Sequence, residues 1–232
     1  MLLAGCATGQ APRPVSGPGS DVPPWRIPET AFGSQRLYRA SYKGPEGEGS
    51  FRVTLRLAAA DRYQIQAVDP VGRALWSLDV AGDRGLSLNH RSRTYCLLEG
   101  SFDLSGAALG PFPLLSLPSL LLERLPAEPA EPAVEKGREI SFHDASGRRW
   151  AATRGADGRL ESWVLRERDV PTVWWVRRDG WSILSDRERG MQVRWREVLH
   201  EDLGGELAAL ERPPAYREEC RETDMPDAER QD

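Results

Sequence analysis

The chain has few side chains whose types and spacing could perform catalysis or bind a metal. Its three histidines, His90, His143 and His200, are far apart and follow neither Glu-x-x-His nor His-x-His spacing. No Gly-x-Ser-x-Gly segment is present to expose a nucleophilic serine. His143 and Asp144 lie in the segment HDASG, which is typical of a turn. We therefore expect no enzyme activity, no metal site and no cofactor.

Cys6 is a candidate for covalent modification, because it ends the short apolar stretch MLLAGC. The sequence LAGC resembles the bacterial lipobox, in which signal peptidase II cuts before the cysteine and the thiol receives a diacylglycerol. No basic segment precedes Leu2, so residues 1–6 are expected to be the remnant of a lipoprotein signal peptide. Ala7 replaces the Asp that this family uses for inner-membrane retention, which favours the outer membrane, facing the periplasm. The alternative is a chance match at the start of a cytosolic protein.

Cys96 and Cys220 remain once lipidation uses Cys6. In an exported protein two leftover thiols favour a disulfide, which here would join the charged C-terminal tail to the edge of a sheet. The alternative is a buried free thiol at Cys96 and an exposed thiol at Cys220.

The composition fits one globular domain with polar ends. Of the 232 residues, 40% are hydrophobic and 28% charged, and the net charge of -4 does not suggest the basic face that nucleic acid requires. No apolar run reaches the roughly 18 residues of a transmembrane helix. Residues 7–28 are rich in Pro, Gly and Ser and are expected to form a flexible linker. Residues 205–232 are charged and expected to be largely disordered, which leaves 29–204 as the domain. We expect a monomer.

Alternating apolar and polar residues dominate the domain. The segment FRVTLRL places Phe51, Val53 and Leu55 on one face of a strand, and similar segments recur between short turns. Together they predict about 10 to 11 antiparallel strands joined by hairpins. Helical spacing appears only near residues 28–35 and 114–125. The fold class is therefore mainly β: a curved antiparallel sheet forming an open half-barrel, with one to three short helices as plug or lid.

The order of these segments resembles the periplasmic carrier and outer-membrane receptor of the bacterial lipoprotein-localisation (Lol) system. The resemblance covers roughly residues 34–200 and depends on three segments, YQIQAVDPVGRALWSLDVAGDRGLSL, YCLLEG and LPSLLLERL. It implies a LolA/LolB-like half-barrel, whose concave apolar face holds acyl chains under a helical lid. Its implied cavity wall and lid comprise Phe51, Val53, Leu55, Tyr63, Ile65, Trp76, Leu78, Leu117, Leu120, Leu121, Trp163, Trp175 and Trp195.

An apolar sheet face is more often packed core than a ligand site, so each of these residues has that alternative. Trp174 and Trp175 are neighbours on a strand, so one of them must face outward. The leading hypothesis is a membrane-anchored carrier or receptor in the cell envelope that binds lipid or lipoprotein acyl chains. Its partners would be the membrane, through the lipid on Cys6, and lipoproteins or phospholipids. The alternative is a structural or accessory lipoprotein of an envelope assembly or secretion complex, with no lipid ligand.

Overall fold

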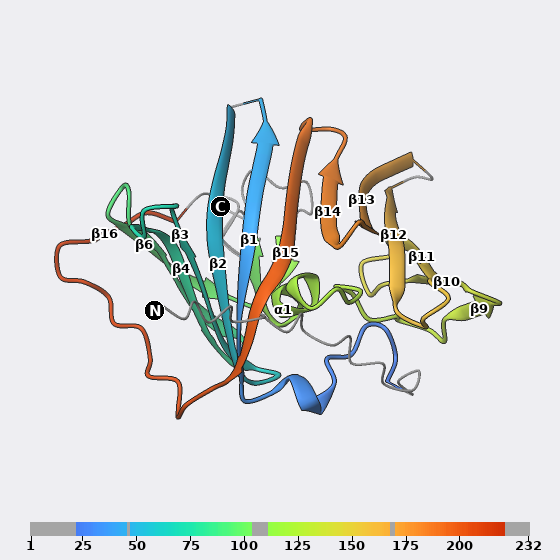
Figure 1. Cartoon of the computed structure of the whole chain (residues 1–232), viewed down its shortest axis with the longest axis horizontal. Helices are drawn as coiled ribbons and strands as arrows, with labels where there is room; N and C mark the ends of the chain where they lie inside the picture. Colours follow the sequence, from blue (N-terminus) through green and yellow to red (C-terminus); the bar gives the residue numbers. More distant parts are fainter. Residues whose placement is uncertain (1–21, 46, 104–110, 168–169, 221–232) are drawn as a thin grey trace, which may run out of the picture.

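The computed structural model describes residues 22–45, 47–103, 111–167 and 170–220. Fourteen strands form one sheet in the order β16-β6-β5-β4-β3-β2-β1-β15-β14-β13-β12-β11-β10-β9. Neighbouring strands are antiparallel, except that β16 and β6 run parallel. The ends of the sheet, β9 and β16, do not pair with each other, so the sheet curves into an unclosed half-barrel (Figure 1).

The elements have the following bounds: η1 Glu29–Ala31, β1 Ser34–Gly44, β2 Gly47–Ala59, β3 Arg62–Val68, β4 Ala74–Ala81, β5 Arg84–Asn89, β6 Thr94–Glu99, β7 Ser101–Asp103, β8 Pro111–Pro113, η2 Leu114–Ser116, α1 Leu117–Leu121, β9 Val134–Lys136, β10 Glu139–His143, β11 Arg149–Arg154, β12 Leu160–Glu167, β13 Val170–Arg178, β14 Trp181–Asp186, β15 Met191–Asp202 and β16 Arg217–Glu218.

The mainly β, open half-barrel fold predicted from the sequence is confirmed. The structure has more strands than expected, because β7, β8, β9 and β16 are only two or three residues long and carry no visible alternation. The helix expected over 28–35 is wrong beyond the single turn η1, since β1 already begins at Ser34. In the Leu-rich segment the helical turns end at Leu121, although Leu125 is fully buried beyond them.

The inner face of the half-barrel is covered by the segment η2–α1. Leu114, Leu117 and Leu120 belong to the same hydrophobic cluster as the inward side chains of the sheet. The N-terminal segment also packs here: Trp25 lies against Phe142, with ring centroids 5.9 Å apart. Residues 22–28 are therefore part of the folded unit and not of a flexible linker, because their apolar side chains join the core.

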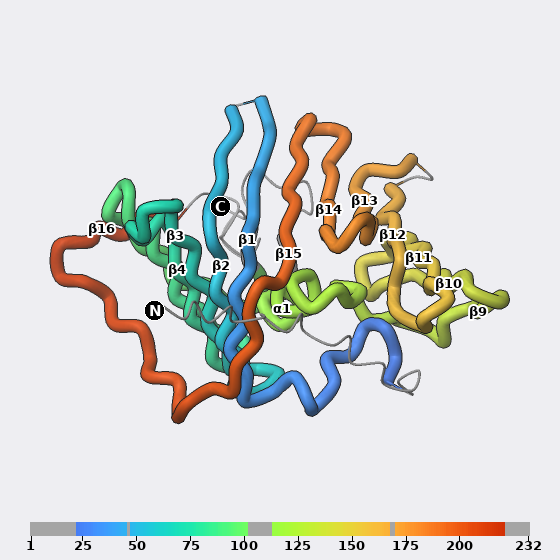
Figure 2. Tube along the Cα trace, viewed as in Figure 1, coloured from blue at the N-terminus to red at the C-terminus, as the bar shows by residue number. Residues whose placement is uncertain are grey.

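The C-terminal segment is likewise more ordered than its charge suggested. After β15 the chain runs along the outer side of β3–β6 and reaches the edge as β16 (Figure 2). Gln64 Nε2 donates to the carbonyl oxygen of Ala208 at 2.6 Å, and Asp79 Oδ2 accepts from the backbone N–H of Leu210 at 3.0 Å. The expectation of a disordered tail is thus wrong for residues 205–220, because outward polar side chains of the sheet bind its backbone.

Candidate functional site

The residues expected to form the cavity wall and lid come together in one hydrophobic cluster. Phe51, Trp76 and Leu121 are partly buried, and the others are buried. Leu55, Tyr63 and Leu78 show no exposed surface at all. In this closed arrangement the inner face of the sheet and the segment η2–α1 fill the half-barrel together. That these side chains contact a ligand stays a proposal.

One end of the covering segment is fixed to strands β3 and β5. The Tyr63 hydroxyl donates to the carbonyl oxygen of Leu114 at 2.5 Å. Leu114 also packs against β5, because a Cβ placed on Gly85 would lie 3.4 Å from Leu114 Cδ1, in van der Waals contact. We call residues 114–125 the lid, and this contact its first latch.

The other end of the lid is held by polar groups. Glu123 follows α1 with a φ of 57°, and its carboxylate accepts from Ser182 Oγ at 2.8 Å. Arg159 also pairs with Glu123, at 2.9 Å. Arg177 pairs with Asp157 at 2.8 Å. This second latch therefore joins the lid to β14 through a partly exposed network of charges.

Aromatic rings line the inner face on the opposite side from β2–β6. Trp150 and Trp163 have ring centroids 5.3 Å apart, and Trp163 stacks on Trp175 at 6.4 Å. Trp175 points inward and is 1% exposed, whereas its neighbour Trp174 is only partly buried on the outer face. The two neighbouring tryptophans therefore point to opposite faces of the sheet, as expected from the sequence.

Several buried polar atoms near these rings lack a hydrogen-bond partner among the described residues. Four of them are donors on β1, β13 and β15, which we call the donor cluster: Arg36 Nε, Tyr38 Oη, Trp175 Nε1 and Trp195 Nε1. The fifth atom, Asp186 Oδ2, is an acceptor on β14. The sequence predicts Trp175 and Trp195 only as apolar wall, and it carries no signal that identifies Arg36 and Tyr38 as members of the site.

Burial raises the pKa of Tyr38, and the nearby carboxylate of Glu197 raises it further. Arg36 lies close enough to act in the opposite direction, but it donates no hydrogen bond of normal geometry to the hydroxyl. Burial also raises the pKa of Tyr63. Both phenols therefore keep their protons at neutral pH and can serve as hydrogen-bond donors.

The histidines do not form a catalytic group. His90 lies between Ser77 Oγ and Tyr216 Oη, each 2.8 Å from a ring nitrogen, and burial lowers its pKa. This contact ties the C-terminal segment to β4 and β5. His143 lines a surface pocket of about 520 Å³, and His200 is exposed. Within the described ranges, no group of three or more His, Cys, Asp or Glu could hold a metal ion.

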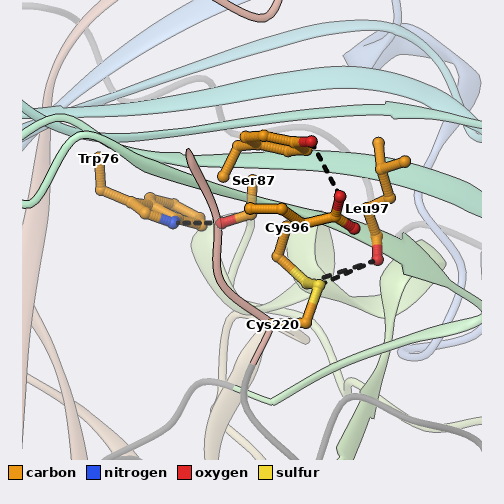
Figure 3. Close-up of a disulfide and its surroundings, with 7 residues drawn as sticks. Trp76, Ser87, Cys96, Leu97 and Cys220 are labelled. Atoms are coloured by element: carbon orange, nitrogen blue, oxygen red, sulfur yellow. Dashed lines mark hydrogen bonds between the residues drawn. A yellow bond between two sulfur atoms is a disulfide. The ribbon is translucent and has the colours of Figure 1, made fainter. Parts of the chain in front are cut away.

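Cys96 and Cys220 are joined by a disulfide, with their Cα atoms 4.9 Å apart (Figure 3). It lies beside the hydrogen bond from Trp76 Nε1 to Ser87 Oγ, which is 2.9 Å long. The bond fixes the C-terminal segment to β6, next to the edge strand β16. Cys6 lies outside the described residues. In the part of the chain that the structure describes, no helix is long and apolar enough to span a bilayer.

No protein-family model matches the sequence, and no curated protein matches it. Solved structures do. A LolA superfamily protein from Nitrosomonas europaea is 11% identical, with a TM-score of 0.52 over 79% of this chain and 90% of that chain. An outer membrane lipoprotein-sorting protein domain from Vibrio parahaemolyticus is 8% identical, with a TM-score of 0.47 over 75% of this chain and 86% of that chain. The unclosed sheet, its lid and the first of these likenesses together show that the chain has the fold of the LolA superfamily.

Proposed function

We propose that this chain binds acyl chains of lipids or lipoproteins between the concave face of its half-barrel and the lid, as a carrier or receptor in the bacterial cell envelope. The observation that carries the proposal is the lid itself. It covers the apolar face as a separate segment, held at one end by Tyr63 and at the other by Ser182. In this proposal the two polar latches break and re-form while the sheet stays folded.

Binding would follow from the hydrophobic effect. Moving an acyl chain from water into the concave face gains roughly 25 cal/mol per Å² of apolar surface buried. The lid must first leave that face, which exposes Leu117 and Leu120. The ligand chain then replaces the contacts of these leucines, so binding and lid opening are coupled. No proton transfer or bond cleavage is part of this function.

We further propose that Cys6 anchors the chain to the outer membrane. The disulfide supports export, because such bonds persist in oxidising compartments such as the periplasm. With a host lipoprotein signal sequence fused before Leu2, the chain should incorporate labelled palmitate, and Cys6→Ser should abolish the label. Equal labelling of the Cys6→Ser variant would disprove this anchor.

Native mass spectrometry of the chain recovered from a bacterial periplasm tests the binding function. We expect co-purifying phospholipid or acylated peptide, with loss of this mass in Leu121→Glu. Leu121 is half-buried on the inner side of the lid, whereas Leu115 is 47% exposed on the same segment. Leu115→Glu is therefore the matched control and should retain the ligand. A ligand-free mass that does not change on adding lipid or lipopeptide would refute the proposal.

The packed interior favours a second candidate, an accessory lipoprotein with no lipid ligand. All the expected wall residues already contact one another or the lid, as in an ordinary core. This candidate predicts the ligand-free protein just described. It also predicts that Leu121→Glu carries no less bound ligand than the wild-type chain. The same experiment therefore separates the two functions.

A further inference from the structure

The donor cluster is unusual because its atoms are buried and unpaired. Tyr38 is 1% exposed, Trp175 1% and Trp195 4%, yet no acceptor among the described residues meets their hydroxyl or indole N–H groups. Other buried indoles do find partners: Trp150 Nε1 donates to Asp144 Oδ2 at 2.9 Å. Buried polar groups are nearly always hydrogen-bonded, so several unpaired donors on one face point to an acceptor that binds there.

The donors occupy neighbouring positions on the concave face. Trp195 lies opposite Ala40, two residues from Tyr38 on β1, and Arg36 is the next residue of β1 on the same face. Across β14, the residues opposite Trp195 and Trp175 are two positions apart. Adjacent positions on one face of a sheet are about 5 to 8 Å apart. Trp195 and Trp175 lie on strands separated by β14, roughly 10 Å apart, so only an elongated ligand could contact both.

Two arginines around the cluster already have carboxylate partners, and Asp186 adds a buried carboxylate on β14 whose Oδ2 has no partner among the described residues. Arg36 Nη1 pairs with Glu197 at 2.8 Å, and its buried Nε–H has no partner among the described residues. Arg177 pairs with Asp157 at 2.8 Å and lies 4.0 Å from Glu123. An anionic group such as phosphate would have to compete with these carboxylates. A neutral acceptor needs no counter-charge, so the site favours carbonyl oxygens.

We propose that the donor cluster receives the carbonyl oxygens of an acyl ester or acyl amide whose chain lies under the lid. This inference rests on the proposed function and adds which chemical group, an ester or amide carbonyl, the polar head of the ligand presents to the protein. The cluster adjoins the second latch, because Ser182 lies opposite Trp195 and donates to Glu123. The head of the ligand would thus lie at the polar end of the lid, where Glu197 and Arg159 reach solvent.

Two probes that differ only at the carbonyl test this inference: 1-palmitoylglycerol, an ester, and 1-O-hexadecylglycerol, the matching ether. Their binding to the purified 232-residue chain, with its disulfide intact, is measured by native mass spectrometry titration. We expect the ester to bind more tightly, by roughly five- to tenfold for each hydrogen bond to the carbonyl. Tyr38→Phe should lower the affinity for the ester by about fivefold and leave that for the ether unchanged.

Trp195→Phe gives a second variant, and Trp150→Phe is its matched control. Both lose the same part of the indole ring, but Trp150 already donates to Asp144, so its loss should not alter the ester-to-ether ratio. Equal affinities of the wild-type chain for ester and ether would overturn the carbonyl inference while leaving acyl binding intact. Binding of neither probe would overturn the proposed function, and this inference with it.

The same acyl ester occurs in lipoproteins and in bilayer lipids, so the source of the ligand is tested in two parallel transfer experiments, the two arms of the test. A diacylglyceryl-cysteine peptide represents the first source, and dipalmitoylphosphatidylcholine vesicles represent the second. The arm that delivers its lipid to the chain identifies the source, and Tyr38→Phe should weaken that transfer. Transfer in both arms with no effect of Tyr38→Phe would contradict the proposed role of the cluster.

Discussion

Strands β2–β6 and the strands β1, β13 and β15 line the same concave face, but their buried polar groups differ. In the first set, Tyr63 donates to Leu114 and Trp76 donates to Ser87. In the second set, Tyr38 and Trp195 have no partner among the described residues. An unpaired buried donor costs about 1–3 kcal/mol of stability. A cost borne by several neighbouring residues is better explained by binding than by folding.

The two sets of strands also differ in what packs against their outer faces. Strands β3–β6 are backed by the C-terminal segment, which the disulfide holds in place. On the outer side of β14 and β15, Arg194 and Arg196 lie over the Trp181 ring, 5.0 and 4.7 Å from its centroid. We therefore call the first set the frame, because the C-terminal segment and the disulfide fix it from outside, and we call the second set the binding strands.

Breaking the disulfide should have the largest effect on the frame. The bond closes a loop with a sequence separation of 124 residues, and chain entropy predicts a loss of about 4–5 kcal/mol in unfolding free energy on reduction. Urea unfolding with and without reductant measures this loss. The double variant Cys96→Ser, Cys220→Ser should be less stable and insensitive to reductant. Equal midpoints for the wild-type chain in both conditions would show that the frame does not depend on the bond.

A tryptophan pair tests whether unpaired donors lack a structural role. Trp150→Phe and Trp195→Phe remove the same ring volume from fully packed positions, so their difference isolates the indole N–H. Trp150→Phe also leaves the Asp144 carboxylate with one donor fewer. We expect its unfolding free energy to lie about 2 kcal/mol below that of Trp195→Phe. Equal losses in urea denaturation would mean that the N–H of Trp195 stabilises the fold after all.

A pair of tyrosine variants makes the same comparison, with a smaller expected difference in unfolding free energy. Tyr63→Phe removes the bond to Leu114, leaves that carbonyl buried, and should lower the unfolding free energy by about 1–2 kcal/mol. Tyr38→Phe removes a hydroxyl that has no partner, so stability should stay the same or rise by up to about 1 kcal/mol. Thermal and urea unfolding give both values. A larger loss in Tyr38→Phe than in Tyr63→Phe would reverse the proposed division between frame and binding strands.

The sequence predicts the frame better than strand β1, for a physical reason. In β2 the inward residues are apolar and the outward residues polar, so alternation identifies the strand. In β1 the inward positions include Ser34 and Arg36, so the same pattern is absent and the strand was missed. A strand whose buried face is polar is difficult to recognise without its partners, and in this chain it is the strand that carries half of the donor cluster.

The C-terminal segment was missed because its bonds use backbone groups. Arg62 and Gln64 donate to the carbonyls of Leu207 and Ala208, and such contacts have no sequence signature. The turns are the opposite case. The segments DPVGR and DASGR form the same turn, in which the carboxylates of Asp69 and Asp144 each accept two backbone N–H groups. Asp and Gly at fixed spacing suffice to predict it.

These two turns also give the smallest expected effect, a dependence of stability on pH. Burial acts to raise the pKa of Asp144, but hydrogen bonds from Trp150 and Arg148 outweigh it and hold the pKa below its usual value. The pKa of Asp69 is lowered as well, against burial, by hydrogen bonds from Arg73. A carboxylate with a lowered folded pKa stabilises the fold above its unfolded pKa of about 3.9 and loses this contribution as pH falls through the folded value.

Urea unfolding between pH 5 and pH 2 should therefore show stability falling with pH. Asp144→Asn should reduce the slope more than Asp69→Asn, because only Asp144 also accepts from a buried indole. Trp150→Phe should reduce the slope in the same direction, since it removes one of the bonds that favour the ionised form. Trp195→Phe, whose indole N–H has no acceptor among the described residues, should leave the slope unchanged. A change of slope in Trp195→Phe would mean that this indole does interact with an ionised group in the folded chain, and that it belongs with the frame.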